Sequence, residues 1–125
     1  MNTLTLAKIA QYRSMLSDSE EALLALEMLE DCEGDLEDAA ISIALQVGQE
    51  PDRSDLWLDG LAKRWRTVIC DHSVYAALEQ SELKKAIALF TEQTPLPSKL
   101  AVLVVVYVLE YGIEPFCQPL QEKLG

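Results

Sequence analysis

Leu100-Ala-Val-Leu-Val-Val-Val-Tyr-Val-Leu109 is the longest apolar run in the sequence, and it decides the fold. A membrane-spanning helix needs about 20 apolar residues, so a run of ten is expected inside a protein core instead. Its five valines favour a strand on propensity alone, and that alternative stays open. We predict a helix near residues 98–111, because no other segment offers a strand to pair with. A helix that is apolar all round must be packed on every side, so we place it at the centre of the protein.

The segments on both sides of this run carry apolar residues at helical spacing. We therefore predict an all-α fold, a single-domain bundle of about six to eight helices over residues 1–125. An acidic three-helix N-terminal unit covers 1–48, and C-terminal helices cover 54–125. The expected helices occupy residues 5–15, 19–32, 36–47, 54–70, two short segments from 73 with a break near Ser81, 98–111, and a terminal segment from Pro115 or Pro119 to about 124. A chain of this length buries enough apolar surface to fold without a disulfide or a metal.

Capping and turn residues indicate where the first helices begin and end. Ser17 and Glu20 have the spacing of a capping box, which predicts the start of the second helix. Gly34 breaks that helix, and the Asp35 side chain can cap the third one. Gly48 then ends the third helix, because glycine adopts the left-handed conformation that helix ends often require.

The clearest linker is residues 49–53, which contain Pro51, and the fourth helix begins directly after it. Within that helix, Asp59 and Lys63 lie four residues apart in the order that favours an ion pair. Gly60 in mid-helix costs about 1 kcal/mol relative to alanine. We interpret it as the mark of a close helix crossing.

The charge of the protein is strongly acidic, at −11 from 10 basic and 21 acidic side chains. The whole excess lies in the first 59 residues, and residues 18–38 hold ten carboxylates and no basic side chain. Such a charge argues against duplex DNA or an anionic membrane as partner, because proteins bind both of these mainly through lysine and arginine side chains. The acidic stretch is either a solvated face or a surface that attracts a cationic partner. Its candidate partner-binding residues are Glu27, Glu30, Asp31, Glu33 and Glu37.

The sequence carries no motif that predicts a cofactor or a catalytic residue. It has no phosphate-binding glycine loop, no nucleophile elbow and no metal-binding HExxH helix. The acidic run from Asp31 does not fit a calcium-binding loop, since its sixth and twelfth positions hold Leu36 and Ser42. The triplet 70–72, Cys-Asp-His, holds the only imidazole, but residues two apart seldom bind one metal. We therefore expect no metal site and no cofactor.

The cysteines and the N-terminus indicate a cytoplasmic protein. Three cysteines are an odd number, and the first residues lack the basic and apolar segments of a signal peptide. A reducing compartment is then the expected environment. No membrane association is expected.

The segment Ala22-Leu-Leu-Ala-Leu-Glu-Met-Leu-Glu-Asp-Cys-Glu-Gly-Asp-Leu-Glu-Asp-Ala-Ala-Ile41 resembles the second and third helices of ubiquitin-associated (UBA-like) domains. With the first helix, the resemblance covers about residues 4–48. That family contacts ubiquitin through a Met-Gly-Phe/Tyr loop, and this chain has Met15-Leu-Ser-Asp-Ser19 at that place. The resemblance therefore implies a small three-helix fold used for protein contacts.

These observations lead us to expect a non-catalytic protein that interacts with, or regulates, a protein partner with a basic surface. Self-association is a further expectation, because residues 100–109 together with Ile41 and Leu45 provide an excess of apolar surface. Two alternatives stay open. One is an acidic mimic or inhibitor of a nucleic-acid-binding protein, and the other is a small cofactor-free enzyme that uses carboxylates.

Overall fold

The computed structural model describes residues 3–49 and 56–124, the side chains of 121–124 excepted. Within these residues the chain is all-α: it forms nine helices, no strand, and one isolated backbone bridge between Thr3 and Asp35. The helices are α1 (Leu6–Met15), α2 (Glu20–Asp31), α3 (Leu36–Gln46), α4 (Trp57–Arg64), α5 (Arg66–Ile69), α6 (His72–Glu79), α7 (Leu83–Glu92), α8 (Ser98–Tyr111) and α9 (Ile113–Leu124). The all-α prediction is confirmed.

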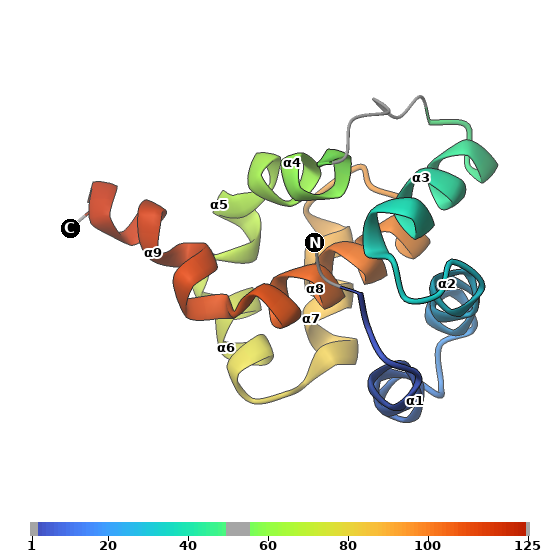
Figure 1. Cartoon of the computed structure of the whole chain (residues 1–125). Coiled ribbons are helices and arrows are strands. Elements are labelled where there is room, and N and C mark those ends of the chain that lie inside the picture. The colour runs from blue at the N-terminus through green and yellow to red at the C-terminus, as the bar shows by residue number, and fades with distance from the viewer. Residues whose placement is uncertain (1–2, 50–55, 125) are drawn as a thin grey trace.

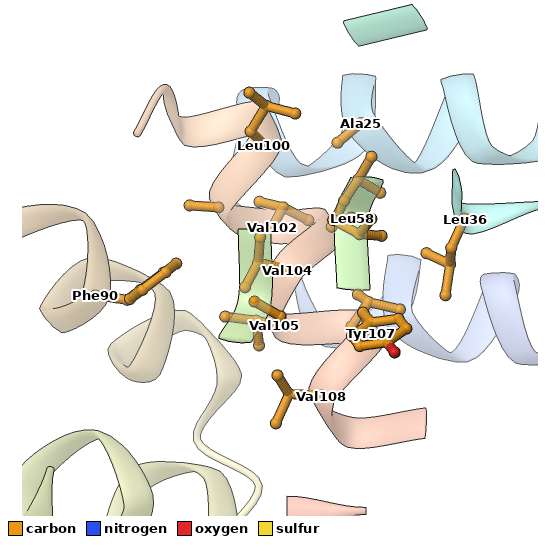
Figure 2. Packing of buried hydrophobic residues seen from close by; sticks show 14 of the residues in the cluster. Ala25, Leu36, Leu58, Phe90, Leu100, Val102, Val104, Val105, Tyr107 and Val108 are labelled. Carbon is orange, nitrogen blue, oxygen red and sulfur yellow. The ribbon is translucent and has the colours of Figure 1, made fainter. Parts of the chain in front are cut away.

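Helix α8 is the centre of the bundle, as the apolar run predicts. Every residue from Leu100 to Val108 is buried, and α8 packs against α2, α3, α4, α7 and α9. Figure 2 shows side chains from four of these helices around it: Ala25, Leu36, Leu58 and Phe90. Burial of each large apolar side chain contributes about 1.5–3 kcal/mol, so α8 supplies much of the folding energy. The strand alternative for this segment is excluded.

The other helices are arranged around α8 (Figure 1). Helices α1, α2 and α3 lie on one side, and α9 leaves the end of α8 at an angle of 95° toward the opposite side. No single helix in the described ranges is long and apolar enough to cross a membrane; only α8 and residues 113–120 together meet that test, and they are bent. Buried side chains of the N-terminal unit and of the C-terminal helices form one core cluster.

Gly34 fixes the turn between α2 and α3. Its φ is +83°, which glycine adopts without strain, and its carbonyl accepts a hydrogen bond from the Leu4 N–H at 2.9 Å. A Cβ at this position would lie 2.0 Å from the Leu4 carbonyl oxygen. The Asp35 side chain then accepts from the Asp38 N–H at 3.1 Å, which confirms the predicted cap of α3. The predicted stop at Gly48 is confirmed by its φ of +78°.

The start of α2 differs from the capping box expected at Ser17. The chain first makes a turn in which the Ser19 N–H donates to the Leu16 carbonyl at 3.0 Å, and Leu16 is buried. The helix therefore begins two residues later than that cap predicts, and the Ser19 hydroxyl accepts from the Ala22 N–H at 3.2 Å.

The segment expected as one helix over 54–70 is divided at Trp65. The described residues therefore form nine helices where six to eight were expected. The two parts pack in different directions: α4 contacts α3 and α8, whereas α5 contacts α6 and α9. The expected start at residue 54 lies outside the described residues. The interpretation of Gly60 is wrong, because Gly60 is exposed and a Cβ added there would contact no other helix within 4 Å.

A disulfide joins Cys70, at the end of α5, to the buried Cys117 of α9. Their Cα atoms are 5.7 Å apart, a normal separation for such a bond. Next to it the Arg66 guanidinium lies 4.8 Å from the centre of the Phe116 ring. A reducing compartment predicts free thiols, so for this pair the expectation does not hold, and Cys32 is the free cysteine of the three.

Candidate functional site

The side of α2 that points away from the core carries the exposed carboxylates predicted from the sequence. The opposite side buries four residues, Ala22, Ala25, Leu26 and Leu29. The outward positions 20, 24, 27 and 31 are separated by four, three and four residues, and this spacing places them on one line of the helix surface. We call this line, together with the following turn, the acidic face; its residues are Glu20, Leu24, Glu27, Asp31 and Glu33, all exposed.

Leu24 interrupts the charge at the middle of the acidic face. Its side chain is 42 % exposed, although the residues of α2 on the opposite side are completely buried. In the described part of the chain, Glu27, Asp31 and Glu33 form no ion pair. Within those residues no cation offsets their mutual repulsion.

Glu30 is also exposed, but it already has a cation. The Arg13 guanidinium of α1 donates to its carboxylate at 3.0 Å, with 37 % and 43 % of the two side chains exposed. An ion pair this exposed contributes at most about 1 kcal/mol, so a stronger partner could displace it. Glu30 therefore lies beside the acidic face, on the side toward α1.

The expectation for Glu37 needs correction, because this residue points into the protein. Glu37 is 7 % exposed, and its two carboxylate oxygens accept the N–H groups of Leu58 at 2.6 Å and Asp59 at 3.0 Å. Burial, opposed by these two hydrogen bonds, raises the pKa of Glu37. The carboxylate caps the start of α4, whose first N–H groups have no acceptor within the helix.

A sequence signal for this inward position exists. Glu37 precedes Ala40 by three residues and Ala44 by seven, and both alanines are buried. The spacing puts all three on one side of α3. The acidic composition of the surrounding stretch hid this signal.

Asp59 continues the buried polar cluster that Glu37 begins. It accepts hydrogen bonds from the Tyr107 hydroxyl and from Lys63 at 2.9 Å, and the second contact confirms the predicted ion pair. Burial alone would raise the pKa of Asp59, but the hydrogen bonds from Tyr107 and Lys63 outweigh it and lower the pKa. Burial, together with the bond to Asp59, raises the pKa of Tyr107.

All four carboxylate oxygens of Glu37 and Asp59 therefore have partners inside the fold. A catalytic carboxylate needs an oxygen that can reach a substrate. This cluster joins α3, α4 and α8, and its role is structural. Tyr107 was not singled out in the sequence because it lies within an otherwise apolar run.

A second polar group, which the sequence analysis missed, lies between α1 and the end of α8. The Tyr12 hydroxyl donates to Glu110 Oε2 at 2.5 Å, and the two residues are 98 positions apart. Burial and the bond to Glu110 raise the pKa of Tyr12. A surface hollow of about 280 Å³ opens beside this pair.

In residues 3–49 and 56–124 the structure places no three His, Cys, Asp or Glu side chains where they could hold a metal together. The resemblance of residues 4–48 to UBA-like domains stays a prediction, although the three expected helices are present as α1, α2 and α3. No protein family, curated protein or solved structure matches the chain, so its function has to be inferred from its own geometry.

Proposed function

We propose that this chain is a non-catalytic interaction protein whose acidic face binds a basic segment of a protein partner. The observation that carries the proposal is the combination of unpaired carboxylates with one exposed leucine on a single helix face. Exposed charge alone is explained by solubility. Leu24 adds to this charge an apolar contact at the centre of the acidic face, where an amphipathic basic segment would meet both.

The shape of the acidic face indicates the kind of segment it binds. Helix α2 has 12 residues and is therefore about 18 Å long, which matches about three turns of a partner helix. A fitting segment places an apolar residue on Leu24 and lysine or arginine opposite Glu27 and Asp31. The charges bring the partner in quickly, and the apolar contact keeps it bound.

The charge density favours this function over mimicry of a nucleic acid. Duplex DNA carries about one charge per 1.7 Å, or about ten over the length of α2. Over the same length α2 has five exposed carboxylates, with Leu24 among them: Glu20, Glu21, Glu27, Glu30 and Asp31. A protein that binds DNA would meet about half of the charge that it recognises.

The geometry also favours binding over catalysis. The carboxylates of the acidic face lie on the outer side of a helix, where solvent reaches them, whereas catalytic carboxylates work inside a hollow with convergent polar groups.

The expected reason for self-association is weaker than the sequence suggested. Residues 100–108 are buried within one chain, although Leu45 stays 53 % exposed.

A photo-crosslinking amino acid in place of Leu24 tests the proposal in the full chain. The matched control carries the same group at Leu56, which is 55 % exposed but belongs to the start of α4. We expect the probe at Leu24, and not the one at Leu56, to crosslink a protein through a segment rich in lysine or arginine. Crosslinking to a neutral or acidic segment contradicts the proposal.

Two triple variants then test whether the charges carry the binding. Neutralisation of the acidic face by Glu27→Gln, Asp31→Asn and Glu33→Gln should weaken the identified complex by about tenfold or more and reduce its salt dependence. The control replaces three exposed carboxylates of other elements with glutamine: Glu79, Glu92 and Glu114. Equal binding by the two triple variants would show that the acidic face is only a solvated surface.

A further inference from the structure

The hollow beside Tyr12 and Glu110 is lined by α1, by the end of α8, and by residues on both sides of the turn that joins α6 to α7. Helix α1 packs mainly against α2, and it reaches the end of α8 through polar side chains. The volume of the hollow, about 280 Å³, is just below the usual range for small-molecule sites. A ligand of the size of one free amino acid fits such a space.

Glu110 is the central charged group of the hollow. Its Oε2 atom accepts the Tyr12 hydroxyl at 2.5 Å and lies 3.7 Å from Lys8 Nζ, which is too long for a hydrogen bond. The carboxylate is thus held in place by Tyr12, and only 20 % of the Glu110 side chain is exposed. In the described part of the chain, Oε1 has no partner, so it is available to a donor from outside.

The hollow contains one charge of each sign, which limits the ligands that it can take. A simple cation is attracted by Glu110 but repelled by Lys8, and a simple anion meets the reverse. A zwitterion satisfies both, with its ammonium group at Oε1 of Glu110 and its carboxylate at Nζ of Lys8. Charge-assisted hydrogen bonds of this kind are the strong ones, especially where solvent is partly excluded.

The rest of the lining combines two polar residues, Gln11 and Ser81, with four apolar ones. Met15 of α1, Leu78 of α6 and Leu83 of α7 border the hollow, and Leu109 precedes Glu110 on α8. These side chains would cover a branched aliphatic group next to the two charges. We propose that the hollow binds a free α-amino acid, or a similar small zwitterion, with an aliphatic side chain.

Another hollow, between α7 and the turn before α2, does not meet the same conditions. It also contains opposite charges, Asp18 and Lys84, which lie 3.1 Å apart. Their side chains are 76 % and 64 % exposed, so water screens both charges. In the Tyr12 and Glu110 hollow, by contrast, the carboxylate is 20 % exposed and is held by the Tyr12 hydroxyl, and Lys8 is 45 % exposed. It shares no residue with the acidic face, and this inference is independent of the proposed function.

The test is a titration of the full chain with L-leucine, followed through the backbone amide signals in NMR. We expect a Kd between about 10 μM and 1 mM, a range reached by ligands of about nine heavy atoms. The largest signal changes should come from Tyr12, Ser81 and Leu83. Two analogues separate the charges: 4-methylpentanoate lacks the ammonium group, and 3-methylbutylamine lacks the carboxylate. Each should bind at least about tenfold more weakly than leucine.

Two variants assign the contacts. Glu110→Gln keeps an oxygen that accepts from Tyr12 but removes the charge, so leucine binding should fall by about tenfold or more. Lys8→Gln changes an exposed side chain; it should weaken leucine binding and leave the binding of 3-methylbutylamine unchanged or stronger. Glu92→Gln, the same charge change at the far end of α7, is the control and should bind leucine as the original chain does.

Several outcomes would overturn the inference. They are no signal change at about 10 mM leucine, changes confined to another part of the chain, equal binding of leucine and both analogues, or unaltered leucine binding by Lys8→Gln and Glu110→Gln. The amide spectrum of each variant reports its fold at the same time. If Glu110→Gln loses its fold, Lys8→Gln with the two analogues decides the question alone.

Discussion

Replacement of Glu37 by alanine should destabilise the protein, because the buried carboxylate caps α4. The variant leaves the N–H groups of Leu58 and Asp59 without their acceptor. The Leu58 N–H is buried and costs about 1–3 kcal/mol when unpaired, whereas the less buried Asp59 N–H can be reached by water. Removal of a carboxylate whose ionised form is disfavoured by burial offsets part of this cost. We expect a net loss of about 2 kcal/mol in the free energy of unfolding.

Urea unfolding followed by circular dichroism at pH 7 measures this change. The control is Glu27→Ala, which removes an exposed carboxylate without a partner and should stay within about 0.5 kcal/mol of the original chain. Glu37→Gln should fall between the two, since the amide oxygen can accept one of the two N–H groups.

The pH dependence gives a second, independent check. Burial raises the pKa of Glu37 in the folded state above its unfolded value. The stability that this group contributes is therefore full below the unfolded pKa and decreases as the pH rises through the folded pKa. The difference between the original chain and Glu37→Gln should thus be larger at pH 5 than at pH 8. If Glu37→Ala is as stable as the original chain, the capping role is refuted, and Glu37 returns to the list of partner-binding candidates.

Two further predictions concern the disulfide and the glycines. Reduction of the bond between Cys70 and Cys117, which are 47 positions apart, should lower the free energy of unfolding by about 4 kcal/mol, because the reduced unfolded chain gains loop entropy. Urea unfolding with and without reductant measures this loss. A change below about 1 kcal/mol contradicts the prediction. Gly34→Ala should cost at least about 2 kcal/mol, because a Cβ meets the Leu4 carbonyl and the φ is positive, whereas Gly60→Ala should gain about 0.5–1 kcal/mol at its open helical position. Thermal unfolding of both variants checks this pair, and a change of the same sign in the two would refute the reasoning.

Much of the local structure follows from the sequence because it depends on neighbours in the chain. The run from Leu100 is apolar on every side of a helix, so it can only lie in a core. The cap at Asp35 and the stops at Gly34 and Gly48 depend on short-range hydrogen bonds and on backbone conformation. For the same reason the ion pair of Asp59 with Lys63 on one helix could be predicted.

The candidate sites were predictable only in part. Composition located the exposed carboxylates Glu27, Asp31 and Glu33, but it gave Glu37 the same role, although Glu37 lies on the buried side of α3. Composition also says nothing of the cation that is already beside Glu30. The exposed position of Leu24 became evident only when the core-facing side of α2 was known.

The sequence by itself determined that this protein is helical, that the run from Leu100 lies in its core, and that its acidity is concentrated in the first 59 residues. Only the tertiary structure decided which side chains from distant segments meet: Cys70 with Cys117, Glu37 with the start of α4, and Tyr12 with Glu110. The physical reason is that helix formation and capping are governed by residues within one turn of each other. Contacts between helices depend on how whole helices pack around α8, and that arrangement is set by the shape of the complete core.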